Sequence, residues 1–231
     1  MRKIKAVFIK QMLSFFKNPS MIGAPIAFLL IPFMILVLVP DTGDSRGLIV
    51  SQFVVMFSGI AMIGTSAGFI MEDRATMNLR FMGMAGVKPF QYLIATCATL
   101  LVISLIANVL FGLMLMYPLE EMLNFLAVAT LGALCSMMLG ITLSLSKLAN
   151  FTGIIGLILG VGPIFADANE FLERIFYFTF THQVNTAVRG VVDVNYADTF
   201  QVIFINLAII FVAFVIMNSR TGLDGEKLVK K

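Results

Sequence analysis

Residues 89–119 read PFQYLIATCATLLVISLIANVLFGLMLMYPL, and none of them is Asp, Glu, Lys or Arg. A helix needs about 20 apolar residues to cross about 30 Å of hydrocarbon. A charged side chain at mid-bilayer costs about 2.5–3.5 kcal/mol on insertion scales. An uncharged stretch of this length is therefore typical of a membrane-spanning helix.

Five further stretches share this property. Together they predict six spans, at residues 21–40, 47–71, 89–119, 122–146, 148–166 and 199–219. The composition agrees, because 59% of the chain is hydrophobic, 13% is charged and the mean hydropathy is +0.98, whereas soluble domains carry about 25% charge. We expect an all-α, polytopic membrane protein with one transmembrane domain over residues 1–231.

The basic residues predict the orientation of these spans. With the N-terminus in the cytoplasm, 13 of the 16 Lys and Arg residues fall in inner segments, and only Arg46, Arg174 and Arg189 fall outside. Nine of the 13 acidic residues belong to the outer segments: Asp41, Asp44, Glu120, Glu121, Asp167, Glu170, Glu173, Asp193 and Asp198. Lys and Arg set orientation, so both termini are expected in the cytoplasm.

Residues 1–18 form a basic segment before the first span. Apolar residues recur there at helical spacing, while the lysines fall on other faces. This pattern favours an amphipathic helix in the headgroup layer, with its lysines toward anionic lipid. The alternative is a basic flank that only sets topology.

The segment between spans two and three, residues 72–88, predicts a short cytoplasmic helix. It opens with Glu72, Asp73 and Arg74, continues through Met77, Arg80 and Phe81, and ends near Pro89. Exposed Met and Phe side chains suit the groove of a partner protein. The alternative is a helix that lies flat on the inner leaflet.

The outer segment, residues 163–198, is long for a connector. It contains an aromatic run with Phe176, Tyr177 and Phe178, too short and too charged to span. Such a run could enter the outer leaflet and return if protein or water satisfied its backbone. An aromatic belt at the membrane surface is the alternative.

Small residues mark two spans as sites of close helix packing. Gly156 and Gly160 form a GxxxG pair in span five, and Gly64 and Gly68 form another in span two. Such pairs allow close approach in lipid, either between subunits or within one subunit.

Signals for catalysis are weak. Ser66 lies in a GxSxG pattern inside an apolar stretch, and His182, in the outer segment, is the only histidine. Glu120 and Glu121 lack the further histidines that a metalloprotease needs. The chain has no P-loop motif, no mid-span acid or base for proton relay, and no basic, aromatic-interleaved block for nucleic acid. We expect a non-enzymatic protein that contacts lipid and no nucleic acid.

The order of these features resembles the membrane subunit of a bacterial type-2 ATP-binding cassette (ABC) transporter. The shared pattern covers nearly the whole chain: a basic amphipathic helix, six spans, and a charged and then apolar helix after span two. The family also places re-entrant aromatic helices between spans five and six, a place that residues 171–189 could take here. Ala75 and Thr76 stand where the family often has Gly.

The resemblance implies a permease subunit in a bacterial plasma membrane that binds a soluble ATPase and a second permease copy, identical or related. ATP and Mg would be bound by the ATPase, and this chain would hold no cofactor. Residues 1–18 would be the connecting helix and 72–88 the coupling helix. The residues expected to contact the ATPase are Glu72, Asp73, Arg74, Met77, Arg80 and Phe81.

The resemblance also implies a substrate route between the two permease copies, lined by spans two and five. The candidate lining residues are Phe53, Met56, Phe57, Phe69, Ile154, Leu157 and Val161. An apolar lining favours export of a hydrophobic or amphipathic cargo such as a peptide, drug or lipid. The alternatives are an ATPase-independent pore or immunity protein and an intramembrane hydrolase that uses Ser66 or Glu120.

Overall fold

The structure is a computed structural model that describes residues 2–38, 44–166, 169–189 and 196–221. Every regular element in these ranges is a helix. In chain order they are α1 (Arg2–Lys17), α2 (Pro19–Leu38), α3 (Asp44–Met56), the π-helix η1 (Phe57–Met62), α4 (Ile63–Ala75), α5 (Asn78–Met84), α6 (Pro89–Leu115), α7 (Leu119–Leu145), the 3₁₀ turn η2 (Lys147–Phe151), α8 (Thr152–Ala166), α9 (Glu170–Phe176), α10 (Phe180–Val188) and α11 (Tyr196–Thr221).

In the part of the chain that the structure describes, six helices are long and apolar enough to cross a membrane, which confirms the expected number. They comprise Met21–Leu38, Arg46–Ala75, Pro89–Leu115, Leu119–Leu145, Leu148–Ala166 and Tyr196–Ser219. Length and composition therefore define a multi-pass, all-helical membrane protein. Residues 39 and 40, at the end of the expected first span, lie outside the described residues.

The third and fourth spans meet at a different place than expected. The helix α6 ends at Leu115, not at residue 119, because Met116 adopts a left-handed conformation with φ of 56°. The helix α7 begins at Leu119, so Glu120 and Glu121 lie in its first turn. Carboxylates are favourable there, because the helix dipole is positive at its N-terminus.

The second span is longer than expected and contains a π-helix. It runs without a break from α3 through η1 and α4 to Ala75, four residues past the expected end at Met71. Glu72, Asp73 and Arg74 consequently form the last turns of a spanning helix and not the start of a separate one. The short helix α5 begins only at Asn78.

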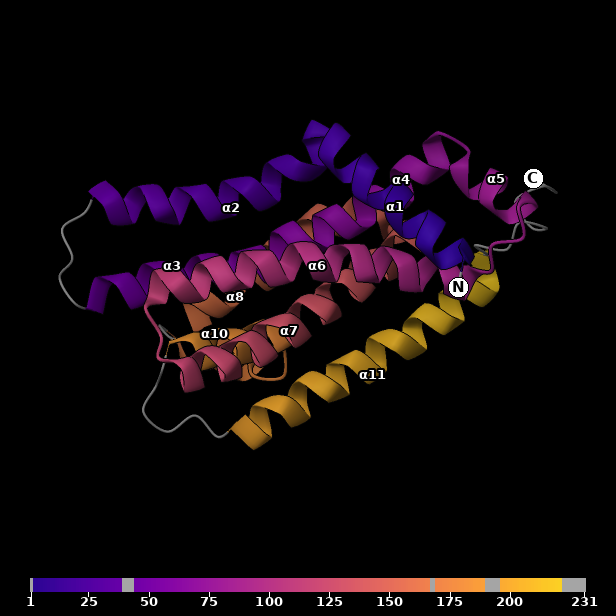
Figure 1. The fold of residues 1–231 in the computed structure, drawn as a ribbon. Coiled ribbons are helices and arrows are strands. Elements are labelled where there is room, and N and C mark those ends of the chain that lie inside the picture. The colour runs from indigo at the N-terminus through magenta and orange to yellow at the C-terminus, as the bar shows by residue number, and fades with distance from the viewer. Residues whose placement is uncertain (1, 39–43, 167–168, 190–195, 222–231) are drawn as a thin grey trace.

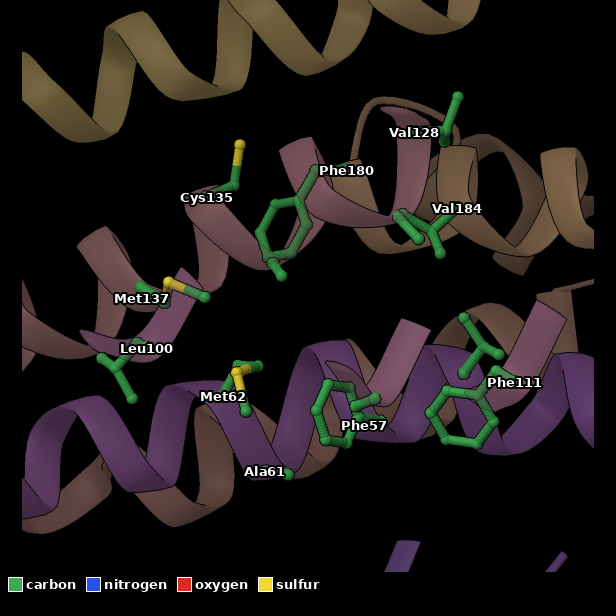
Figure 2. Packing of buried hydrophobic residues seen from close by; sticks show 14 of the residues in the cluster. Phe57, Ala61, Met62, Leu100, Phe111, Val128, Cys135, Met137, Phe180 and Val184 are labelled. Atoms are coloured by element: carbon green, nitrogen blue, oxygen red, sulfur yellow. The ribbon is translucent and has the colours of Figure 1, made fainter. Parts of the chain in front are cut away.

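The centre of the bundle is α7, which packs against α4, α6 and α11. Figure 2 shows Met137 of α7 facing Met62 and Leu100, and Phe57 lying close to Phe111. The helices α2, α8 and α11 are much less buried than α7. Their outward apolar side chains, such as Val37 and Ile209, require lipid as the surrounding solvent.

The π-helix η1 packs directly on α8. A Cβ added at Gly59 would lie 2.4 Å from the Cα atom of Gly160, and one added at Gly156 would lie 3.1 Å from the carbonyl oxygen of Gly59. The GxxxG pair of span five therefore packs inside this chain, against span two. Gly64 has nothing within 4 Å of its added Cβ, so its face remains open.

The two ends of the bundle differ in charge. Figure 1 shows α1, α5 and the last turns of α11 toward one end, here named the α5 end, and α10 toward the other. The α5 end carries the basic residues of α1 and of the α4–α6 stretch: Arg2, Lys3, Lys5, Lys10, Lys17, Arg74, Arg80 and Lys88. The opposite end carries Glu120, Glu121, Glu170, Glu173 and Asp198, with Arg46, Arg174 and Arg189.

The orientation argument also used residues that the structure leaves out. Asp41, Asp167, Asp193, Lys227, Lys230 and Lys231 lie outside the described residues.

Candidate docking site at the α5 end

Two turns hold α5 away from the spanning helices. Met77 adopts a left-handed conformation with φ of 55° between α4 and α5. After α5, Gly86 has φ of 70°, a conformation that favours glycine. The Lys3 ammonium donates a hydrogen bond of 2.8 Å to the Gly86 carbonyl oxygen, which links this turn to the start of α1.

Leu79 and Met82 of α5 pack against neighbouring helices, whereas Arg80, Phe81 and Met84 are exposed. Leu79 is buried in a cluster with Val7 of α1 and with Tyr92 and Leu93 of α6. Exposed side chains cover the remaining surface: Met77, Arg80, Phe81 and Met84. Phe81 is 60% exposed and Met84 is 62% exposed, so this end of the molecule presents flexible and aromatic side chains beyond the spanning segments.

Behind α5, the Asp73 carboxylate is the centre of a buried polar cluster. Its Oδ1 atom forms an ion pair with the Lys10 ammonium. Its Oδ2 atom accepts hydrogen bonds of 2.9 Å from the Gln11 amide and 2.7 Å from the Tyr92 hydroxyl. Because an unpaired carboxylate would be costly to bury, these donors explain how Asp73 can be fully buried.

The residues beside Asp73 also bond within the chain. Glu72 accepts a hydrogen bond of 3.0 Å from the Ser14 hydroxyl of α1. Arg74 donates one of 2.8 Å to the Ser144 carbonyl oxygen, near the end of α7. The last turn of α4 thus bonds to α1, α6 and α7. The helix α5 is connected to it through the Met77 turn and through the Asn78 amide, which donates a hydrogen bond of 3.4 Å to Oδ1 of Asp73.

The six residues expected to contact an ATPase consequently fall into two groups. Met77, Arg80 and Phe81 are exposed on or next to α5. Glu72 and Arg74 are half-buried and bonded to other helices. The expected role of Asp73 as a contact needs correction, because its carboxylate is fully buried and faces α1 and α6.

The structure does not bring the seven expected lining residues together. Phe57 packs against Phe111 with ring centroids 5.6 Å apart, and Phe69 packs against Phe15 at 6.5 Å. Both phenylalanines are fully buried in the core of this chain, so neither lines an open surface here.

The other lining candidates lie nearer the surface. Ile154 and Leu157 face outward from α8, whereas Phe53, Met56 and Val161 are half-buried. Of the seven candidates, Ile154 and Leu157 are the most exposed to a second copy of the chain.

The segment between α8 and α11 contains a buried helix, α10, whose burial was not predicted from its residue types. All residues of α10 except Thr186 are buried. Phe176 is buried as well, whereas Tyr177 and Phe178 are exposed. The resemblance placed the inserted helices within residues 171–189, and the part of this range that packs among α3, α7, α8 and α11 is α10, not the aromatic run itself.

Two amide side chains hold this part of the chain. The Gln183 amide donates 2.7 Å to the Tyr177 carbonyl oxygen, and the Asn185 amide donates 3.3 Å to the Pro163 carbonyl oxygen. The signal that could have revealed α10 is the group of hydrogen-bonding side chains at 181–185. In a membrane protein such side chains often bond to buried carbonyl groups.

The two residues considered for catalysis, Ser66 and Glu120, both lie within long helices. Ser66 is buried in α4, and its hydroxyl donates 3.0 Å to the Ile63 carbonyl oxygen, a local bond common for serine in helices. Glu120 is exposed in the first turn of α7. Among the residues that the structure describes, no group of three or more His, Cys, Asp or Glu side chains could hold a metal ion.

No protein-family model matches the chain, and no curated protein matches it in sequence. The class of protein therefore follows from the helices themselves. The chain is a multi-pass α-helical membrane protein with a short exposed helix at its basic end.

Proposed function

We propose that the chain is the permease subunit of an ATP-driven type-2 ABC transporter. In this proposal the α5 end faces the cytoplasm, and a separate ATPase binds ATP and Mg there. The observation that carries the proposal is α5 itself, whose Phe81 and Met84 are exposed at the end of the bundle. Aromatic, Met and Arg side chains are enriched in protein interfaces.

The connections behind α5 support a role in transmitting movement. The buried contacts of Asp73 join α1, α4 and α6, and Arg74 adds the end of α7. A partner that displaced α5 would therefore push on several helices at once. Because a packed interior changes between discrete arrangements, such a displacement would move these helices as a body.

The charge distribution supports the orientation in this proposal. The basic residues of α1 and of the α4–α6 stretch belong to the α5 end. Lys and Arg are enriched in the cytoplasmic segments of membrane proteins. The amphipathic helix α1 exposes Ile9, Leu13 and Phe16, which suits contact with lipid at that surface.

A second permease copy would complete the assembly. Ile154 and Leu157 on α8 offer it an apolar face, and the cargo would be a hydrophobic or amphipathic molecule passing between the copies. The substrate route would open alternately to the two sides of the membrane, driven by closure of the ATPases.

The docking step is tested by co-purification from the native host. We expect an ATPase to co-purify with the wild-type chain and to be lost from the Arg80→Glu, Phe81→Glu double variant. Truncating one interface anchor costs about 2 kcal/mol or more, which corresponds to about 30-fold in affinity.

The matched control is Phe171→Glu, Arg174→Glu, which makes the same changes at exposed positions of α9. This control should retain the ATPase. Equal recovery of the ATPase with both variants would contradict docking at α5. Absence of any ATPase with the wild-type chain would favour an ATPase-independent pore or immunity protein.

A further inference from the structure

The helix α1 has a buried face and an exposed apolar face. The buried face includes Val7 and Phe15, and it packs chiefly against α6. Ile9, Leu13 and Phe16 recur at helical spacing on the opposite side of α1, and their side chains are 46%, 53% and 63% exposed. Because exposure of apolar surface to water is unfavourable, a partner outside the chain must cover this face.

The structure divides the basic residues of α1 into two groups. Lys3 and Lys10 bond within the chain, to the turn after α5 and to the last turn of α4. Arg2, Lys5 and Lys17 are exposed, and within the ranges that the structure describes none of them forms a hydrogen bond or an ion pair. The helix contains no Asp or Glu. Three cations of α1 are therefore available to a partner of opposite charge.

The position of α1 places these groups at a membrane boundary. Figure 1 shows α1 near α5, running obliquely to the spanning helices. The Gln11 amide of α1 donates a hydrogen bond of 3.2 Å to the hydroxyl of Tyr92, in the first turn of α6. The first spanning helix, α2, begins at Pro19, directly after α1. Because the ends of spanning helices lie near the surface of the hydrocarbon, α1 lies at the depth of the lipid headgroups.

An anionic phospholipid matches both features of this face. Its phosphate would pair with the free basic residues, and its acyl chains would cover the apolar ones. Each basic residue next to a membrane strengthens the attraction of anionic lipid by about fivefold. An acidic soluble protein could also pair with the cations, but it would have to enter the headgroup layer to reach α1.

We propose that the exposed face of α1 is a binding site for anionic phospholipid. The phosphate lies between Arg2 and Lys5, which are one helical turn apart and on the same side of α1. The acyl chains lie along Ile9, Leu13 and Phe16. The basic residues give the site its preference for an anionic headgroup, because the apolar residues alone would accept any phospholipid. The site depends neither on an ATPase nor on the transport role proposed above.

The test uses a single fluorescent reporter on this face. The chain has no Trp, so Ile9→Trp reports from α1 alone. The purified full-length variant is placed in phosphatidylcholine nanodiscs that contain a small fraction of brominated phosphatidylglycerol or of brominated phosphatidylcholine, whose bromine atoms quench Trp on contact. We expect phosphatidylglycerol to associate at least about fivefold more strongly than phosphatidylcholine. Arg2→Gln combined with Lys5→Gln in the reporter variant should remove this preference.

Two controls separate a site on α1 from a general effect of charge. Arg80→Gln combined with Lys88→Gln removes two exposed basic residues of the same end outside α1, and the Ile9→Trp reporter should keep its preference. Phe171→Trp reports from α9, which carries Glu170 and Glu173, and it should show no preference for phosphatidylglycerol.

Three results would overturn the proposal. Equal quenching of Ile9→Trp by the two lipids would show that the headgroup charge is not recognised. A preference that survives Arg2→Gln, Lys5→Gln would show that these residues do not bind the phosphate. Absence of quenching by either lipid would show that the face meets water or another protein. Thermal unfolding reports whether each variant folds, and Phe16→Trp is the reporter if Ile9→Trp does not.

Discussion

The Asp73 carboxylate lies where three helices meet, and each of its oxygen atoms has a donor from another helix. Lys10 and Gln11 come from α1, and Tyr92 comes from α6. Because the site is buried, each bond is stronger than it would be in water, and each missing bond would be more costly. This one residue therefore fixes α1 against the spanning helices.

Replacement of Asp73 by Asn should destabilise the protein. The amide keeps the size of the side chain but loses the charge that pairs with Lys10 and one of the two acceptor oxygens. We expect a loss of about 1–3 kcal/mol, the usual cost of leaving buried donors without an acceptor. The measurement is thermal unfolding in detergent.

The matched change is Glu120→Gln, which alters an exposed carboxylate on α7 and should leave the unfolding temperature within error. If Asp73→Asn unfolded at the same temperature as this control, the polar cluster would contribute nothing to stability.

At the scale of elements, the contact between η1 and α8 brings the backbones of two spans close together. Gly59 and Gly160 bring their backbones together, and close backbone contact is a main source of helix association in lipid. The π-helix widens the second span at this point, and π-turns often occur at functional sites. The contact joins the two spans that were expected to form the substrate route.

Gly59→Ala should disrupt this contact. The new methyl group would lie 2.4 Å from the Gly160 Cα atom, and backbone atoms cannot move aside as a flexible side chain can. We expect a loss of about 1–3 kcal/mol, as for other overpacked sites, measured by the midpoint of thermal unfolding.

Gly64→Ala serves as the comparison in the same span, because nothing lies within 4 Å of its added methyl group. It should be neutral. Equal unfolding temperatures for the two variants would show that η1 and α8 do not pack as described.

Some elements could be predicted from sequence and others could not. The spans follow from uncharged stretches, because lipid excludes charge wherever it surrounds a helix. The ends of the spans do not follow from the same rule. The helix α7 includes Glu120 and Glu121, because carboxylates fit the first turn of a helix. The helix α6 ends before Met116 through the backbone conformation of that residue alone. Nothing in the residue types at 57–62 predicted a π-helix.

In the candidate docking site, too, some features could be predicted from the sequence and others could not. The exposed Met77 and Phe81 were predicted from apolar residues outside the spans, and Arg80 from the resemblance. The burial of Asp73 could not be predicted, because its partners Gln11 and Lys10 are 62 and 63 residues away in the chain. The sequence gives the residue types, but only the packing of α1 against α4 and α6 decides which charge is enclosed.

At the scale of the whole molecule, one end is basic and carries α1 and α5, and the other carries the acidic residues at the start of α7 and in α9. The transport proposal requires the basic end to face the cytoplasm, where ATP and an ATPase are found. The acidic end would then lie at the outer surface of the membrane.

The most direct test of the transport account is the side of the membrane that α5 occupies. Cys97 and Cys135 are first replaced by Ala, and then Arg80→Cys is made in one variant and Phe178→Cys in another, both at exposed positions. The account predicts that a membrane-impermeant maleimide labels Phe178→Cys in intact cells, and labels Arg80→Cys only after the membrane is opened. Labelling of Arg80→Cys in intact cells, with Phe178→Cys protected, would contradict it.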